Sequence, residues 1–254
     1  MSFNDLIENN DNLENNDNLY INYFINFIKY CINNTEIEKN ESNSTIYNSN
    51  NKQEKFLKNL LINKYNFKEI KNEKNDKTKK SKKYIKYTEK EIIDIIKNPK
   101  KSFIKPGQFI HQPLGTQNNP DFLIQLSENI LIPFEAKSAN KYTPQYNSGG
   151  IKPNYIYIFT SQKIKKTTVY LGSDIINENQ IKLIKKYIEK CRLLDKDLNK
   201  LLKENDTNNR GVSYYTRPMI GQKGKKDITN YFEHKDKKKC EENVIEFLEN
   251  LKIE

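Results

Sequence analysis

The feature that most constrains the fold of this 254-residue chain is a pair of short alternating segments on either side of a polar turn. Residues 121–126 and 130–137 are rich in Ile, Leu and Phe, and a Ser-Glu-Asn turn occupies 127–129. This pattern predicts two antiparallel strands joined by a three-residue turn. If the hairpin is symmetric about the middle of that turn, Asp121 lies directly opposite Glu135.

The expected hairpin has two chemically different faces. Side chains alternate along a strand with a period of two, so Lys137 shares a face with Asp121 and Glu135. Directly opposed side chains have Cβ atoms roughly 4.5–5.5 Å apart. One face therefore gathers two carboxylates and an amine, whereas the other is apolar and consists of Phe122, Ile124, Leu126, Ile130, Ile132, Phe134 and Ala136.

Two carboxylates at this separation are suited to holding one hard cation. Mg²⁺ is commonly bound through one or two carboxylates and keeps its other positions for water and substrate phosphate. A neighbouring Lys can position the attacking water and offset the charge on phosphate. We therefore predict that Asp121 and Glu135 hold Mg²⁺ and that Lys137 positions water for the hydrolysis of a phosphodiester.

The formal net charge of +11 is unevenly distributed along the chain. Residues 1–51 contain 2 Lys and 8 acidic residues, whereas residues 52–101 contain 17 Lys and 7 acidic residues. A basic block of this kind favours a polyanionic partner such as DNA. The densest run, Lys77–Lys83, is equally typical of a solvated loop.

A membrane protein and a secreted protein are both disfavoured by the sequence. No apolar run approaches the about 18 residues that a membrane-spanning helix needs, and no helix combines a basic face with exposed Trp or Phe. No secretion signal is recognised, and the three widely spaced cysteines form neither a disulfide framework nor a zinc pattern. We expect a cytoplasmic protein without a membrane partner.

The rest of the chain predicts helices before and after a group of strands, which indicates an α/β (α+β) domain. Thr88 and Glu91 resemble a capping box that opens a short helix ending before Pro99. Residues 33–52 and 206–239 are expected to be irregular. Further strands are expected at 155–161 and 167–171, and helices at 19–31, 56–65, 177–205 and about 241–252.

Pro120-Asp121, followed after 13 residues by Glu135-Ala136-Lys137, resembles the signature of the PD-(D/E)xK metal-dependent nucleases. This resemblance implies a restriction-endonuclease-like core, in which helices flank a mixed central sheet of four to five strands. It also assigns the catalytic role to the same two acids and lysine that the hairpin brings together.

The wider context resembles type II restriction endonucleases. Gly-Thr-Gln at 115–117, Ser138 and Tyr-Asn-Ser-Gly at 146–149 carry this resemblance, which spans about residues 107–172. It implies a Mg²⁺-dependent homodimer that cuts double-stranded DNA at a short sequence, with a cognate DNA methyltransferase as a genetic rather than a bound partner. Residues 102–254 would form the nuclease core with a DNA-contacting C-terminal segment. Residues 1–101 would be a helical, Lys-rich arm or subdomain packed on it, within one compact domain.

Two regions are candidates for contact with DNA, namely the loop after the second hairpin strand and the segment that holds two of the three arginines. Arg pairs with guanine through two hydrogen bonds, and Asn and Gln pair with adenine. A basic surface that contacts only phosphates explains the second region equally well. The predicted DNA-binding residues are Gln117, Asn119, Ser138, Asn140, Lys141, Tyr142, Asn147, Lys152, Arg210, Tyr215, Arg217, Gln222 and Lys223.

Some assignments stay open on the sequence alone. His111 could contact DNA, although a lone histidine is more often structural. A third acid from an N-terminal helix, such as Glu54 or Glu91, could join the metal site, but the sequence gives it no support. Two other functions also remain: a structure-specific or repair nuclease of the same superfamily, and a non-catalytic basic nucleic-acid-binding protein.

Overall fold

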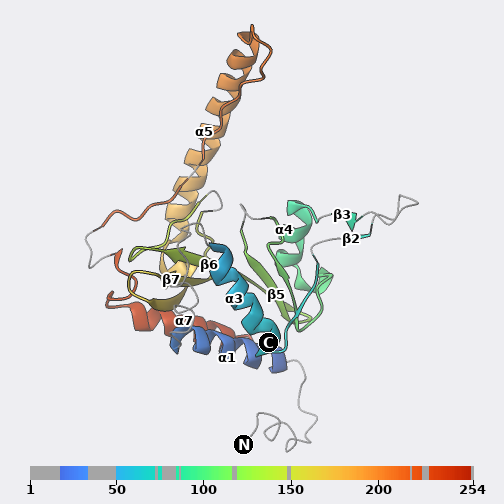
Figure 1. Cartoon of the computed structure of the whole chain (residues 1–254), viewed down its shortest axis with the longest axis vertical. Coiled ribbons are helices and arrows are strands. Elements are labelled where there is room, and N and C mark those ends of the chain that lie inside the picture. The colour runs from blue at the N-terminus through green and yellow to red at the C-terminus, as the bar shows by residue number, and fades with distance from the viewer. Residues whose placement is uncertain are drawn as a thin grey trace, which may run out of the picture.

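The structure is a computed structural model that describes residues 18–33, 50–71, 74–75, 84–85, 87–115, 119–147, 150–217, 219–224 and 229–252. A mixed sheet with strand order β1-β4-β5-β6-β7-β8 forms its centre, and one long helix projects from it (Figure 1). The six strands are β1 (Lys68–Glu69), β4 (Gln108–His111), β5 (Phe122–Ser127), β6 (Ile130–Ala139), β7 (Ile156–Ser161) and β8 (Lys166–Leu171).

Helices lie on both faces of this sheet. A separate short pair, β2 (Lys74–Asn75) and β3 (Tyr84–Ile85), stands apart from it. Short 3₁₀ turns occupy Pro99–Lys101 and Gly172–Asp174. The helices are α1 (Leu19–Asn33), α3 (Asn50–Asn63), α4 (Glu89–Lys97), α5 (Glu178–Glu204) and α7 (Lys237–Asn250). No helix in the described part of the chain is long and apolar enough to cross a membrane.

The α+β class is confirmed, but the expected count of four to five strands is wrong because the main sheet has six. The four strands expected from the sequence correspond to β5, β6, β7 and β8. The sequence missed β1 and β4, which have two and four residues, because so short a segment shows no measurable alternation. Pairing with a neighbour, rather than local pattern, makes them strands: β1 pairs parallel to β4, and β4 antiparallel to β5.

Two helices begin earlier than expected. Helix α3 starts at Asn50, so the expected loop at 33–52 is wrong for its last three residues, while residues 34–49 lie outside the described part. The first turn of α3 contains no apolar side chain, and it therefore lacks the 3.6-residue signal on which the prediction relied. Helix α7 begins at Lys237 for the same reason.

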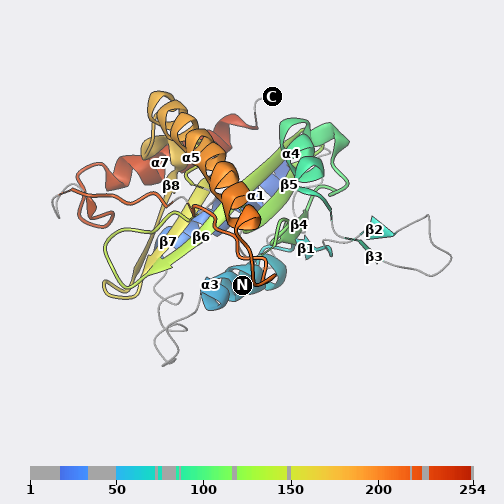
Figure 2. The same cartoon turned by 90° about the horizontal axis from the view of Figure 1, so that it is seen from above.

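The main hydrophobic core lies on one face of the sheet, beneath α1, α3 and α7. The predicted apolar face of the hairpin is buried there against Phe24, Phe27, Leu57, Leu61, Val244 and Leu248. Phe122 and Phe134 stack at 4.5 Å between ring centroids. Smaller clusters cover the other face beside α4 and beside the base of α5. Figure 2 shows α1 behind the sheet, with α4 and α5 in front of it.

The register of the β5–β6 hairpin agrees with the prediction. Phe122 pairs with Phe134, so the preceding Asp121 faces Glu135 across the two strands. The predicted three-residue turn is wrong, since 128–129 form a two-residue turn. An irregularity between Gln125 and Ser127 adds one residue to β5 and compensates for the shorter turn.

The capping box at the start of α4 is confirmed. Thr88 Oγ1 accepts a hydrogen bond from Glu91 N, and Thr88 N donates to Glu91 Oε2 at 2.7 Å. The carboxylate of Glu91 therefore caps α4, which gives it a structural role in place of the metal-binding role considered from the sequence.

We predict that the attachment of α3 to the sheet contributes strongly to stability. Leu61 is fully buried in the main core, whereas its neighbour Ile62 is exposed. Leu61→Ala should lower the free energy of unfolding by about 2–5 kcal/mol, because it removes buried apolar surface and leaves a cavity. Ile62→Ala, the matched control, should lower it by less than about 1 kcal/mol. Urea denaturation measures both, and equal losses would contradict the described packing.

Candidate active site

Asp121, Glu135 and Lys137 converge at one point of the sheet. Asp121 directly precedes β5, while Glu135 and Lys137 are two residues apart on the adjacent β6. Asp121 N donates to Glu135 Oε2 at 3.1 Å, and Ala136 N donates to Asp121 Oδ2 at 2.9 Å. Lys137 Nζ donates to Glu135 Oε1 at 2.6 Å. The arrangement expected of the hairpin is thus present, with all three polar groups in one connected set.

When both carboxyl groups of this set are ionised, the single positive charge of Lys137 neutralises only one of the two negative charges. Glu135 is only 2% exposed. Burial raises the pKa of Asp121 well above its ordinary value, and the charges of Glu135 and Glu54 raise it further. Burial also raises the pKa of Glu135, although the ammonium group of Lys137 opposes that rise. A buried cation would stabilise the ionised carboxylates, which one lysine does only in part.

A third carboxylate, Glu54 of α3, lies beside this set. Glu54 is 4% exposed, and its Oε2 lies 2.8 Å from His111 Nε2 and accepts a hydrogen bond from Gln112 Nε2 at 2.8 Å. Its charge is near enough to raise the pKa of both Asp121 and Glu135. One sequence signal could have found it: Glu54 stands three residues before the buried Leu57 and therefore interrupts the apolar stripe of α3.

His111 has a structural environment. Its ring lies against Phe122 with centroids 4.9 Å apart, and its Nε2 faces Glu54. Gln112, which the sequence did not single out, is held next to Asp121 because Gln112 N donates to Asp121 O at 2.6 Å. The end of β4 therefore fixes Glu54 beside the hairpin.

The donor chemistry of this site fits Mg²⁺. Among the described residues, no group of three or more His, Cys, Asp or Glu side chains is placed to hold a metal ion. Asp121 and Glu135 supply two hard oxygen ligands, and Glu54 is oriented toward His111 and Gln112. Mg²⁺ is commonly bound by two protein carboxylates, with water and substrate phosphate at its other coordination positions.

Lys152 is a predicted DNA-binding residue whose charge interacts with Glu135. It belongs to the crossover 140–155 between the parallel strands β6 and β7, and its backbone N donates to Tyr157 Oη at 2.9 Å. Burial lowers the pKa of Lys152, as does the neighbouring Lys185, while Glu89 and Glu135 oppose this effect. The ammonium group of Lys152 therefore interacts electrostatically both with Glu135 of the site and with Lys185 of α5.

The other predicted DNA-binding residues around the hairpin differ in their surroundings. Asn119 Nδ2 donates to Gly150 O at 3.3 Å and joins the two loops at the edge of the site. Gln162 Nε2 donates to Ser138 Oγ at 3.4 Å, and Lys163 Nζ lies 4.9 Å from the centre of the Tyr142 ring. Gln117 lies outside the described residues, as does the run Lys77–Lys83. Three predicted residues are exposed on the crossover: Asn140, Lys141 and Asn147.

The two arginines of the C-terminal candidate segment are far apart. Arg210 N donates to Asp206 Oδ1 just after α5. Arg217 follows Thr216, whose N and Oγ1 both donate to Asp195 within α5. The helix rises about 16 Å between these two aspartates. The two guanidinium groups are therefore attached at separate points of an extended segment, which argues against their reading one base pair together.

The remaining predicted residues near this segment differ in their surroundings. Tyr231 Oη donates to Gln222 Oε1 at 2.9 Å and lies 3.0 Å from Tyr146 Oη. This places Gln222 at the edge of a buried tyrosine network. Tyr215 and Lys223 are exposed.

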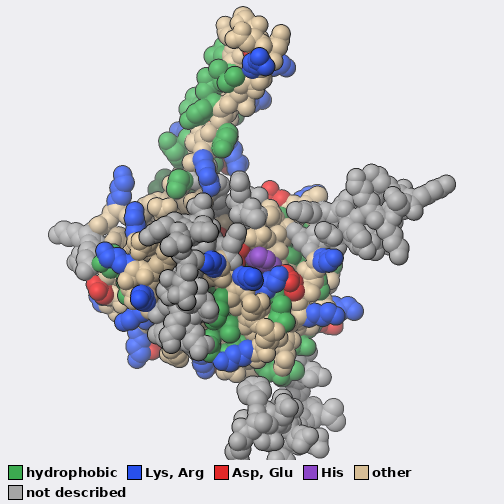
Figure 3. Space-filling model, in the orientation of Figure 1, with side chains coloured by type: hydrophobic (Ala, Val, Ile, Leu, Met, Phe, Trp, Pro, Cys, Tyr) green, Lys and Arg blue, Asp and Glu red, His purple; other side chains and the backbone are tan. Residues whose placement is uncertain are grey.

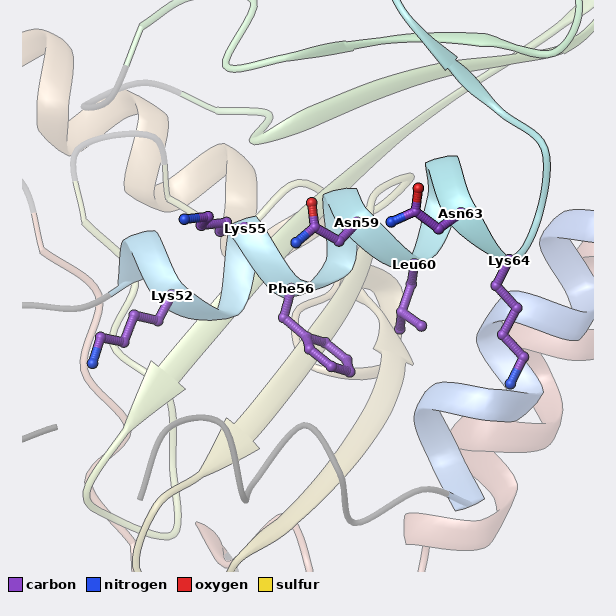
Figure 4. A pocket seen from close by; sticks show the side chains of 7 residues that line it. All are labelled: Lys52, Lys55, Phe56, Asn59, Leu60, Asn63 and Lys64. Atoms are coloured by element: carbon purple, nitrogen blue, oxygen red, sulfur yellow. The ribbon is translucent and has the colours of Figure 1, made fainter. Parts of the chain in front are cut away.

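A basic groove runs along the outer side of α3, on the face of the helix that points away from Glu54. Figure 4 shows Lys52, Lys55 and Lys64 along it, with Phe56 and Leu60 forming its apolar part. Asn59 and Asn63 also line this groove. Ammonium and amide groups at this spacing suit the phosphates and sugars of a nucleic-acid strand.

Comparisons of this chain with family models, with curated proteins and with solved structures found no match.

We predict that Asp121 destabilises the metal-free protein. The pKa of Asp121 is raised, so above about pH 4 the folded state retains a proton that the unfolded chain has lost, and stability falls as the pH rises toward the raised value. Asp121→Asn removes this penalty and keeps an oxygen to accept from Ala136 N. At pH 7 in EDTA, its melting temperature should exceed that of the wild type.

The matched control is Asp94→Asn, because Asp94 is an exposed acid on α4. Its melting temperature should change by no more than about 1 °C, which corresponds to a few tenths of a kcal/mol. A lower melting temperature for Asp121→Asn than for the wild type would show that the carboxylate is stabilised without a cation, contrary to our interpretation.

Proposed function

We propose that this protein is a Mg²⁺-dependent endonuclease that hydrolyses phosphodiester bonds of double-stranded DNA at a specific short sequence. The observation that carries the proposal is the buried cluster of Asp121, Glu135 and Lys137 at neighbouring positions of β5 and β6. Its assignment to the PD-(D/E)xK superfamily, and within it to the type II restriction endonucleases, is supported by the resemblance across residues 107–172.

Each residue of the cluster has a distinct role in this mechanism. Asp121 and Glu135 would hold the ion, which supplies Lewis-acid stabilisation of the charge that develops on the phosphate. Lys137 donates to the oxygen of the attacking water and balances negative charge as it approaches phosphorus. The water loses a proton to solvent as one P–O bond forms to its oxygen, the opposite P–O ester bond breaks, and the released oxygen takes a proton from solvent, so the net change is the addition of one water.

The substrate class follows from charge and position. The chain carries a formal net charge of +11. Lys152 is near enough to Glu135 for their charges to interact, and a separate groove on the outer side of α3 is lined by Lys52, Lys55 and Lys64. Basic side chains at several separate places suit a long polyanion better than a small phosphate ester.

Two rival functions give different results in the same assays. A structure-specific or repair nuclease would cut flaps or junctions and leave an intact palindromic duplex uncut. A non-catalytic nucleic-acid-binding protein would bind without Mg²⁺ and never cleave. Incubating a plasmid of known sequence with Mg²⁺ and mapping the ends distinguishes all three, and a methyltransferase gene next to this one would favour restriction.

Glu135→Gln should abolish cleavage while preserving the fold and DNA binding. The substitution keeps the size of the side chain but removes the charge that binds the ion, so the rate of plasmid cleavage should fall at least about 100-fold. Circular dichroism and a gel-shift assay in EDTA should be unchanged. The control Glu128→Gln changes an exposed acid in the turn of the same hairpin, and it should leave cleavage at the wild-type rate.

Glu54→Gln should change the Mg²⁺ requirement more than the maximal rate. Glu54 adds negative charge beside the ion-binding carboxylates without being oriented as a third ligand. Removing this charge should raise the Mg²⁺ concentration for half-maximal cleavage by about 10- to 100-fold, with most activity recovered at saturating Mg²⁺. Complete loss at every Mg²⁺ concentration would instead assign Glu54 a direct role in the reaction.

A further inference from the structure

Helix α5 and the segment that returns along it form an arm that, in the described chain, packs on a buried hydrophobic cluster only at its base, through Ile181 and Ile184. All 27 residues of α5 are described, and none of them is buried. The return segment, residues 206–217, is held against the helix by reciprocal hydrogen bonds between Asn199 and Tyr214, each 2.7 Å long. Figure 1 shows this arm projecting well away from the sheet.

The arm has an apolar seam with the spacing of a coiled coil. Six residues follow one another at alternating intervals of three and four: Ile184, Tyr187, Cys191, Leu194, Leu198 and Leu201. Tyr187, Leu194, Leu198 and Leu201 are exposed. Figure 3 shows apolar side chains along the arm. A heptad repeat keeps the seam on one side of the helix, where a second helix can cover it.

We propose that this seam binds the same seam of a second copy of the chain, with the two α5 helices antiparallel. This inference goes beyond the proposed catalytic function and does not depend on it. It concerns the surface that joins two subunits, which neither the catalytic cluster nor the resemblance identifies.

The seam is complementary to itself in the antiparallel direction. When Cys191 faces Leu194 of the partner subunit, Tyr187 faces Leu198 of the partner subunit and Ile184 faces Leu201 of the partner subunit. All six positions are then matched, and the two-fold axis passes between Cys191 and Leu194. An interface in which the same patch serves both subunits closes at two copies and leaves no seam exposed.

Charge at the edge of the seam supports the same orientation. Lys190 and Asp197 each directly precede a seam residue, and both are exposed. In the antiparallel pair these flanking positions face each other, so Lys190 meets Asp197 of the partner subunit twice by symmetry. In a parallel pair, Cys191 would face Cys191 of the partner subunit, and Asp197 would face the apolar position of Leu202 of the partner subunit. Lys190 would then face Asp195 of the partner subunit, a carboxylate that already accepts two hydrogen bonds from Thr216 of its own chain.

DNA and the chain's own core fit the seam less well. A phosphate backbone attracts Lys and Arg, whereas this stripe presents Leu and Tyr. The return segment already occupies the side of α5 that carries Asp195 and Asn199, and it adds exposed apolar side chains of its own, Val212, Tyr214 and Tyr215. An apolar patch of this length on an isolated chain indicates a protein partner.

The oligomeric state of the DNA-free protein tests the proposal. Sedimentation equilibrium should give about 60 kDa, twice the 30.1 kDa of one chain, with a dissociation constant on the order of 10 µM for so short a seam. Leu194→Glu should weaken the dimer at least about tenfold. Leu193→Glu is the matched control, because Leu193 is 64% exposed against 67% for Leu194 but lies outside the seam.

Leu193→Glu should dimerise as the wild type does, and circular dichroism should show both variants folded. A wild-type protein that stays monomeric at about 200 µM would overturn the proposal. Equal effects of the two substitutions would also overturn it, as would loss of DNA binding in Leu194→Glu without any change in mass.

A charge swap tests the orientation. Lys190→Asp alone should weaken the dimer about fivefold, because two aspartates then face each other, and adding Asp197→Lys should restore it. In a parallel pair the second change would restore nothing. Mild oxidation should leave the wild type uncrosslinked through Cys191, whereas a Cys191–Cys191 disulfide between subunits would overturn the antiparallel arrangement. Plasmid cleavage is assayed separately, so failure of dimerisation and failure of the catalytic proposal are distinguishable.

Discussion

The contact on which the rest of the site depends is the buried one between Glu135, the backbone of Asp121 and the ammonium group of Lys137. Charged groups are costly to bury, and their positions are maintained only where the surrounding backbone cannot relax. Here the rigidity comes from the opposite face of the hairpin, where Phe122 and Phe134 stack in the aromatic core under α1. Core packing on one face thus holds the carboxylates in register on the other.

Helix α3 connects the N-terminal part of the chain to this hairpin. Gln53 Nε2 donates to Ile158 O at 3.2 Å and to Thr160 Oγ1 at 2.8 Å, so the helix is bonded to β7 one residue before Glu54. On the other side of Glu54, Leu57 enters the main core. Glu54, beside the proposed catalytic cluster, is therefore fixed by residues distant in sequence, and the Lys-rich region contributes to the site as well as to the surface.

The sequence predicts best where local rules determine the structure. A hairpin symmetric about Glu128 predicted the pairing of Asp121 with Glu135, and the capping rule predicted the start of α4 at Thr88. The turn at 128–129 was not predictable, because a bulge and a shorter turn give the same register as a symmetric three-residue turn. Strand β4 and the position of Glu54 depend on tertiary contacts, which one sequence does not reveal. The residues predicted to bind DNA were chosen for chemistry alone, and the structure places Arg210 and Arg217 at separate points of the segment that returns along α5.

An antiparallel pair of arms would also determine how far apart the two proposed active sites lie along one DNA duplex. The symmetry axis lies between Cys191 and Leu194, about 15 residues from the base of each α5, so the two bases are about 44 Å apart along the paired helices. One turn of B-DNA spans about 34–36 Å. The arms would therefore separate the two subunits by more than a helical turn, and each cluster would act on its own phosphodiester bond. Two-fold symmetry of the arm would then be matched by two-fold symmetry of the DNA sequence, which links the apolar seam of α5 to the kind of site that the proposed nuclease would recognise.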